Sequence, residues 1–432
     1  MQSKLLKIFM LLVFSCLSFS AFSASNDAIK GTYKIVINGY EFGPAVDKVI
    51  VKLDKKVLGI TSDLFNVKET KKWYTDKPQE IFDRKVTKAY LSDKDGNEIR
   101  TASDYITLEL YVSPSDGSPL LYDFKKGFNE WNKLYYLTIS LNDGKGLRAI
   151  NNEVYGISIN EKYTDKIMPV GDKFKQSSYS SDNITLGYKY YSPEKDKAKK
   201  PLIIWLHGMG EGGTDSNDSS VALMGNRVSI LGTDEIQKVF GGAYVLVPQA
   251  PTFWMDNGSG DIGKFDGTSK YDKVLINLIK NFVKKNPNVD TKRIIVGGCS
   301  NGGYMTVRLL LNNPNYFAAA FPICEAYTDN LISDKELGTI KNTPIWFTHA
   351  ENDTTVNPKT TSIATYNRLV KLGAKGIHMS LYKNVVDPTG LYRNDKGNLF
   401  EYRGHFSWIY ALNNTNEENG IKMFEWLAKQ SK

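Results

Sequence analysis

The chain has 432 residues, with 55 Lys and Arg against 47 Asp and Glu and a formal net charge of +8. This length exceeds that of one typical domain, so we expect two. The mild basic excess is spread along the chain without a dense basic stripe, which argues against a nucleic-acid-binding protein. No segment is long and apolar enough to predict a transmembrane helix.

The first 25 residues have the layout of a secretory signal. Two lysines precede a short apolar run at residues 8–14, and small residues follow at 21–24. We therefore predict a signal peptide over residues 1–23 and an exported protein, extracellular or periplasmic. A lipid anchor on Cys16 is the less favoured alternative, because the residues before it fit poorly in a lipoprotein processing site.

Residues 28–160 are predicted to form an all-β domain. Candidate strands lie at 49–53, 105–112 and 134–141, and turn sequences rich in Gly, Asp, Asn and Ser separate them. Short strands at this spacing are typical of an immunoglobulin-like sandwich, here without the cysteine pair of antibody domains. The polar segment 161–182 is expected to be a junction.

Residues 183–432 alternate between predicted strands and helices. Continuous apolar strands separated by helices indicate a mostly parallel sheet with helices on both faces, as in the α/β-hydrolase fold. We expect strands at 202–206, 243–247, 293–297, 318–323, 345–348 and 377–381, and helices at 271–286, 304–311 and 363–372.

Ser300 is the candidate nucleophile. It stands in a Gly-x-Ser-x-Gly frame between a predicted strand and a predicted helix. The flanking Gly298 and Gly302 are required because a Cβ at either position would collide with the neighbouring strand or helix. The strained turn points the serine hydroxyl out of the sheet, with helix N–H groups behind it.

A serine nucleophile needs a base and an orienting acid, which should follow it in the order acid, then base. Asp353 follows the predicted strand 345–348, and Glu351 is held in reserve. His405 lies in a loop near the C-terminus, after a glycine and ahead of the last helix. We therefore predict Asp353 as the acid and His405 as the base.

The other three histidines are less suited to act as the base. His207 lies before the serine, His349 precedes the acid, and His378 lies inside a predicted strand. Elimination among only four histidines therefore favours His405.

The glycine-dense loop 207–213 leaves a buried strand and is suited to bind an oxyanion through backbone N–H groups. We predict the N–H groups of Met209 and Asn301 as the two donors. The loop lacks the lysine of a phosphate-binding P-loop, and His207 is expected to brace it rather than bind a metal.

Four motifs together resemble those of a known family. They are His207-Gly208-Met209-Gly210-Glu211-Gly212-Gly213, Val247-Pro248-Gln249-Ala250-Pro251 with Trp254, Gly298-Cys299-Ser300-Asn301-Gly302-Gly303, and Gly404-His405-Phe406-Ser407-Trp408. They resemble secreted α/β-hydrolase esterases related to prolyl oligopeptidase and to polyhydroxybutyrate depolymerases. Segments 43–49, 95–97 and 105–110 resemble the immunoglobulin-like N-terminal domain of one branch of these esterases.

The resemblance implies carboxylic ester hydrolysis with Ser300, Asp353 and His405 as the triad and with neither a metal nor an organic cofactor. Met209 stands where relatives often carry a smaller residue. The expected substrate is a small acyl ester or an ester-bearing polymer. Trp254 is a candidate substrate contact, and packing under its loop is the equal alternative.

Two other functions were weighed. A serine peptidase of the prolyl-oligopeptidase type would need a large β-propeller, for which the N-terminal region is too short. A non-catalytic cell-surface binding protein should lack a triad member, whereas all three are present. The N-terminal domain could itself bind a cell-wall polymer, the substrate or a second copy of the chain. Cys299 and Cys324 could form a disulfide or remain buried thiols.

Overall fold

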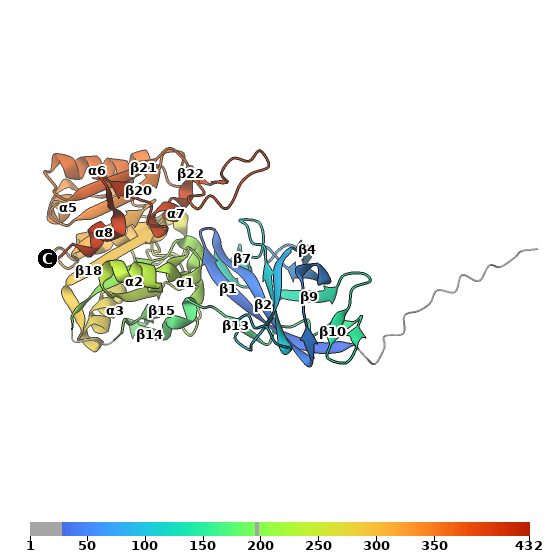
Figure 1. Cartoon of the computed structure of the whole chain (residues 1–432). Coiled ribbons are helices and arrows are strands. Elements are labelled where there is room, and N and C mark those ends of the chain that lie inside the picture. Colours follow the sequence, from blue (N-terminus) through green and yellow to red (C-terminus); the bar gives the residue numbers. More distant parts are fainter. Residues whose placement is uncertain (1–27, 195–197) are drawn as a thin grey trace, which may run out of the picture.

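The computed structural model describes residues 28–194 and 198–432, so the predicted signal peptide and Cys16 lie outside the described residues. The described chain forms an N-terminal β-sandwich beside a C-terminal α/β domain (Figure 1). None of the helices in these two stretches has the length and apolar character needed to cross a membrane.

The N-terminal domain contains two sheets and a separate hairpin. Its strands are β1 (Ile29–Tyr40), β2 (Gly43–Leu58), β3 (Phe65–Lys71), β4 (Glu80–Arg84), β5 (Val86–Ser92), β6 (Ser103–Leu110), β7 (Leu120–Asp123), β8 (Phe128–Trp131), β9 (Tyr136–Leu141), β10 (Leu147–Ala149), β11 (Glu153–Val154), β12 (Ile157–Ile159) and β13 (Asp165–Ile167). The larger sheet has the order β11-β10-β2-β1-β12, with β13 paired to β1, β6 paired to β2 and β5 paired to β6. The smaller sheet has the order β4-β3-β9, and β7 pairs with β8.

Buried apolar residues alternate with more exposed residues along these strands, because successive side chains of a strand point to opposite faces. The buried residues form the core of the sandwich. Tyr33 and Ile35 of β1 are buried in the same apolar cluster as Leu137 and Ile139 of β9 in the other sheet. The Tyr33 hydroxyl also accepts a hydrogen bond of 2.8 Å from the N–H of Leu137. Burial of alternate residues therefore holds the two sheets together.

The C-terminal domain is built on an eight-stranded sheet of order β14-β15-β17-β16-β18-β19-β20-β21. Its strands are β14 (Lys175–Ser181), β15 (Ile184–Tyr191), β16 (Lys200–Leu206), β17 (Tyr244–Gln249), β18 (Val289–Cys299), β19 (Ala319–Ile323), β20 (Ile345–Ala350) and β21 (Ile377–Tyr382). β14, β15 and β17 pair antiparallel, and the strands from β17 to β21 pair parallel. The short strands β22 (Val385–Val386), β23 (Glu401–Tyr402), β24 (Glu417–Glu418) and β25 (Ile421–Lys422) form two small hairpins.

Helices cover both faces of this sheet. They are α1 (Ser220–Met224), α2 (Asp234–Phe240), α3 (Asp272–Lys285), α4 (Asn301–Asn312), α5 (Asp334–Ile340), α6 (Ser362–Lys371), α7 (Trp408–Leu412) and α8 (Met423–Ala428). Ile203 and Trp205 of β16 share an apolar cluster with α1, α2, α7 and α8, whereas Ile204 and Leu206 share one with α3 to α6. Strands buried on both faces explain the continuous apolar runs in the sequence.

The segment predicted as a junction, 161–182, contributes to both domains. It contains β13, which extends the sandwich by pairing with β1, and β14, the edge strand of the α/β sheet. The linker itself is therefore only the short stretch between these two strands.

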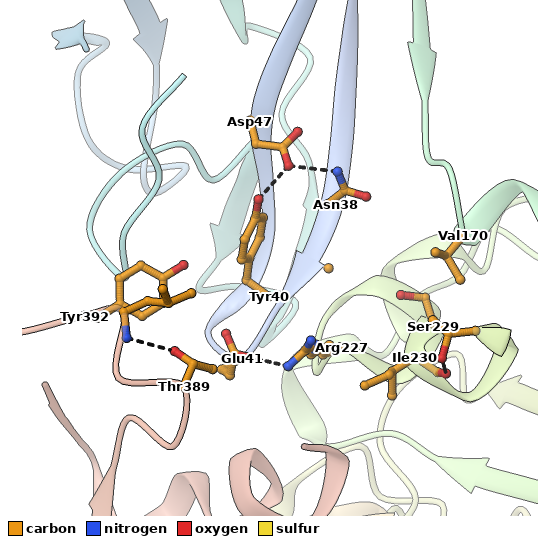
Figure 2. Close-up of a pocket in the computed structure, with 13 residues that line it drawn as sticks. Asn38, Tyr40, Glu41, Asp47, Val170, Arg227, Ser229, Ile230, Thr389 and Tyr392 are labelled. Carbon is orange, nitrogen blue, oxygen red and sulfur yellow. Dashed lines mark hydrogen bonds and ion pairs between the residues drawn. The ribbon is translucent and has the colours of Figure 1, made fainter. Parts of the chain in front are cut away.

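The two domains are joined by a continuous apolar cluster and by polar contacts. Arg227, beside α1, forms an ion pair with Glu41 at the tip of the β1–β2 hairpin and also contacts Asn413. A pocket of about 320 Å³ lies at this junction, lined by both domains and including Tyr40, Arg227 and Tyr392 (Figure 2).

Candidate active site

Ser300 occupies a strained turn between β18 and α4. Its backbone has φ 55° and ψ −115°, a conformation that costs energy for a residue with a Cβ. The turn is tight on both sides: a Cβ on Gly298 would lie 2.4 Å from the Leu206 carbonyl oxygen, and one on Gly302 would lie 1.9 Å from it. Close packing against the end of β16 therefore explains both glycines of the motif.

His405 and Asp353 lie next to Ser300, although both are far from it in the sequence. His405 is in a single 3₁₀ turn, Gly404–Phe406, and its Nε2 atom lies 2.9 Å from the Ser300 Oγ. Its Nδ1 atom lies 2.7 Å from Oδ2 of Asp353, which follows β20. The three side chains predicted from the sequence thus form one continuous chain of hydrogen bonds.

Asp353 is held as an anion by hydrogen-bond donors. Its Oδ1 atom accepts from the N–H groups of Thr355 and Val356, at 2.8 and 2.9 Å. Burial acts to raise the pKa of this carboxyl, but hydrogen bonds from His349 and His405 more than offset it and keep the pKa well below its usual value. The carboxylate therefore stays charged and able to orient His405.

His349 is a second imidazole on the same carboxylate, and its role was not predicted from the sequence. Its side chain is fully buried, and Nε2 lies 3.0 Å from Asp353 Oδ2 and 3.2 Å from the Val356 carbonyl oxygen. Both neighbours are acceptors, so Nε2 carries the proton. Nδ1 lies 2.7 Å from the Ser362 hydroxyl, which fixes the ring from its other side. The signal was present in the sequence, because His349 ends the strand that Asp353 follows.

The loop after β16 carries the predicted oxyanion donor Met209 and is braced by His207. The Nε2 atom of His207 accepts a 3.0 Å hydrogen bond from the N–H of Ala250, so Nδ1–H donates to the carbonyl oxygen of Gly208, at 2.5 Å. Burial lowers the pKa of His207 to about 4, which keeps the ring neutral as this tautomer requires. With these two hydrogen bonds His207 holds the loop in place, as expected from the sequence.

Asn301, the other predicted donor, is the first residue of α4. Its N–H therefore has no acceptor one turn earlier in the helix and remains available near the Ser300 hydroxyl. Its side-chain oxygen accepts a hydrogen bond from the N–H of Trp254, which ties the loop after β17 to the nucleophile turn.

The side chain of Trp254 has no exposed surface. It packs on the His207 ring, with centroids 5.1 Å apart, and edge-to-face on Tyr271. Trp254 therefore packs under its loop, which was one of the two alternatives expected for it. Direct contact with a substrate would require the loop to move.

Two buried carboxyl groups near the site carry raised pKa values. Burial raises the pKa of Glu211, at the end of the oxyanion loop, to about 7, although the Gly208 N–H partly offsets this. Burial likewise raises the pKa of Glu325, beyond the end of β19, to about 8, and the Tyr327 N–H that it accepts opposes the shift. Neither residue was identified from the sequence, because a lone Glu in a loop is usually solvated.

Cys299 and Cys324 are both buried free thiols. β18 and β19 are neighbours as expected, but the strand register places Cys299 opposite Ile323. Within residues 28–194 and 198–432, no three His, Cys, Asp or Glu side chains cluster in a way that could hold a metal ion.

Two families match this chain. Residues 32–155 match the family described as "Esterase Ig-like N-terminal domain", and residues 192–386 match the family described as "Phospholipase/Carboxylesterase". These matches and the strand order confirm the predicted fold class, an immunoglobulin-like sandwich followed by an α/β-hydrolase domain.

One solved structure has the same fold along nearly the whole chain. The chain is similar to one described as a thermostable esterase, with 23% identity over 93% of this chain and 100% of that chain and a TM-score of 0.75. An acylaminoacyl peptidase from Pyrococcus horikoshii aligns at 14% identity over 88% of this chain and 64% of its own, with a TM-score of 0.40. No curated protein sequence matches the chain.

Proposed function

We propose that this chain, whose two domains match the esterase Ig-like and the phospholipase/carboxylesterase families, is an exported serine carboxylesterase using Ser300, His405 and Asp353. The observation that carries this proposal is the unbroken hydrogen-bond chain from the Ser300 Oγ through His405 to Asp353. Such an arrangement activates a hydroxyl that is otherwise a weak nucleophile.

In the proposed reaction, His405 Nε2 takes the Ser300 proton as Oγ attacks the ester carbonyl carbon. The same proton is then given to the leaving alcohol oxygen, which releases the alcohol and leaves an acyl-enzyme. Water attacks the acyl-enzyme in the same way, and the carboxylic acid and free Ser300 result. Asp353 stays ionised throughout and stabilises the imidazolium that forms.

The oxyanion of each tetrahedral intermediate is proposed to bind the N–H groups of Met209 and Asn301. Both lie on rigid supports: His207 holds the loop that carries Met209, and α4 begins at Asn301. Fixed donors of this kind need no reorganisation as charge develops on the oxygen.

The direct test is hydrolysis of short, medium and long p-nitrophenyl acyl esters by the purified protein, compared with Ser300→Ala and His405→Ala. Each substitution is expected to lower kcat by roughly 10⁴-fold or more. The matched control is Ser180→Ala, which removes an exposed serine hydroxyl and should leave kcat unchanged. Equal activity in wild type and both triad variants would overturn the proposal, and cleavage of peptide anilides in preference to esters would favour the peptidase.

Export is proposed on the basis of the predicted signal peptide over residues 1–23. The test is expression of the full chain in a secreting bacterial host, followed by mass spectrometry of the exported protein. A mature N-terminus near residue 24 would support export by ordinary cleavage. A lipidated N-terminus at Cys16, or retention of the uncleaved chain, would contradict it.

A further inference from the structure

Three aromatic side chains form an exposed group on the N-terminal domain, here called the aromatic platform: Tyr74, Tyr122 and Phe124. Phe124 is 58% exposed and Tyr74 is 40% exposed. Their rings are stacked, with centroids 5.1 Å apart and planes inclined by 26°. Tyr122 meets Phe124 edge-to-face at 5.2 Å. The platform is therefore a preformed aromatic cluster in which Tyr74 and Phe124 are exposed to water and Tyr122 is half-buried.

Tyr122 and Phe124 belong to the β7–β8 hairpin, which touches the predicted oxyanion loop, and Tyr74 lies between β3 and β4. Phe124 lies in the turn between β7 and β8, and the Nδ2 atom of Asn129 in β8 donates a 3.0 Å hydrogen bond to the carbonyl oxygen of Gly210. In the same turn, the Met209 methyl lies 3.4 Å from where a Cβ on Gly127 would be. The turn that carries Phe124 therefore rests against the residue proposed to bind the oxyanion.

The loop that the hairpin contacts also contacts the strand end before the nucleophile. The ideal Cβ position of Gly208 lies 3.5 Å from the Sγ of Cys299, the residue before Ser300. From Gly208 to Gly210, where the hairpin makes contact, the chain spans at most about 7 Å. Tyr122 is close enough to the buried Glu211 for that carboxyl to help raise the tyrosine pKa, behind the larger effect of burial. The hairpin that carries Tyr122 and Phe124 therefore contacts the loop that adjoins the nucleophile turn.

One of the two lysines in the turn after Phe124 is already paired, whereas Lys125 is exposed and has no ion-pair partner among the described residues. Lys126, in the same turn, forms ion pairs with Asp123 and Glu130. An aromatic ring of a ligand can stack on the exposed rings of the platform, and aromatic pairs prefer centroid separations like those within the platform.

We propose that the aromatic platform binds the aryl ring of an ester substrate, so that the N-terminal domain forms part of the substrate site. This proposal rests on the proposed esterase function and adds a substrate class to it: esters that carry an aromatic ring on the acyl or the alcohol side.

The test uses the full chain with Phe124→Ala and with Tyr74→Ala. KM and kcat are measured for two matched pairs of esters: phenyl acetate with ethyl acetate, and methyl 3-phenylpropanoate with methyl butanoate. Each substitution is expected to raise KM about 3- to 10-fold for one of the aryl esters and to leave the alkyl esters unchanged. The pair that responds identifies whether the ring lies on the alcohol or the acyl side.

The matched control is Tyr155→Ala. Tyr155 is 68% exposed on the same domain and directly follows β11, which pairs with β10 at the end of the sandwich far from the α/β domain (Figure 1). This variant should behave as wild type on all four esters. Light scattering of wild type and Phe124→Ala adds a further control: a dimer that becomes a monomer would show the platform to be a contact between copies and would overturn the proposal.

Other results would distinguish binding of the aryl ring from a purely structural role of the hairpin. Equal KM changes for aryl and alkyl esters would show that the hairpin only supports the oxyanion loop, and no change for either aryl ester would remove the platform from the site. If wild type hydrolyses neither these four esters nor the p-nitrophenyl esters, the proposed function fails by itself. Saturation-transfer NMR of phenyl acetate with Ser300→Ala then still tests the platform, because binding that persists unchanged in Ser300→Ala/Phe124→Ala would overturn it.

Discussion

His349 donates a hydrogen bond from Nε2 to Oδ2 of Asp353, at 3.0 Å, and this oxygen is also the one bound by the candidate base His405. The carboxylate therefore has two imidazole neighbours, one facing the nucleophile and one fully buried behind it. His349 is a positioning residue by this geometry, since it touches neither Ser300 nor the space in front of it.

Replacement of His349 should weaken the orientation of Asp353 without changing substrate binding. We expect His349→Leu to lower kcat about 10- to 100-fold, because a hydrogen bond to a charged group is lost, while KM changes less than 2-fold. His349→Gln keeps an N–H donor and should recover most of kcat. Steady-state kinetics on a short ester checks both variants.

The control for this pair is His378→Leu, on the neighbouring strand β21, where His378 pairs with Glu418 instead. It should retain wild-type kcat. If His349→Leu also retained kcat, Asp353 would be positioned by the Thr355 and Val356 N–H groups alone.

Asn129 should support catalysis from the other domain. Asn129→Ala removes the hydrogen bond to Gly210 and loosens the oxyanion loop, so kcat should fall about 3- to 10-fold for every ester, aryl or alkyl. Asn142→Ala, whose side chain bonds only within the sandwich, is the control. A ring-selective effect of Asn129→Ala, or none at all, would show that the hydrogen bond does not set the loop geometry.

Glu325 should make the protein less stable as pH rises. Its pKa of about 8 in the folded protein lies above its ordinary value of 4.5, so the folded state holds a proton that the unfolded chain releases. Protonated Glu325 makes its full contribution to the free energy of unfolding below pH 4.5. That contribution, about 4–5 kcal/mol, is lost as the pH rises to about 8.

Glu325→Gln stays uncharged at every pH and should remove this loss. Urea unfolding at pH 5 and pH 9 should give similar stabilities for variant and wild type at pH 5 and a more stable variant at pH 9. Glu417→Gln, at an exposed position, is the control. Parallel pH profiles for wild type and Glu325→Gln would mean that Glu325 ionises normally in the folded protein.

Arg227 should join the two domains through Glu41, which is only 4% exposed (Figure 2). Arg227→Ala leaves this carboxylate buried without its partner and should cost about 2–3 kcal/mol of unfolding free energy. Arg227→Ala/Glu41→Gln should recover part of that loss, whereas Arg148→Ala, at an exposed site, should cost little. Equal stabilities of the single and double variants in urea would argue against the ion pair.

Much of the site was predictable because it depends on chain order and local turns. The Gly-x-Ser-x-Gly frame requires a tight strand-to-helix turn, and a parallel sheet brings the carboxyl ends of β18 and β20 to one edge, so Ser300 and Asp353 had to be near each other. Elimination among four histidines then left His405. The long first strand β1 was not predicted, although its alternating residues Tyr33, Ile35 and Ile37 carried the pattern.

The order of residues in the chain argues against His349 as the base, because it precedes Asp353. That argument does not apply to a residue that binds the carboxylate from the side away from Ser300. Trp254 and the two cysteines were left open for a related reason. Whether a side chain faces a ligand, a neighbour or a second sulfur depends on strand register and on the packing of residues far away in sequence.

The sequence by itself determined the two fold classes, the nucleophile turn and the order of acid and base, since hydrophobic periodicity and glycine sterics act over a few residues. Only the tertiary structure decided that His349 shares Asp353 with His405, that Cys299 and Cys324 are free thiols, and that the β7–β8 hairpin rests on the loop of Met209. These features involve segments up to 82 residues apart, and their geometry follows from how whole sheets and domains pack.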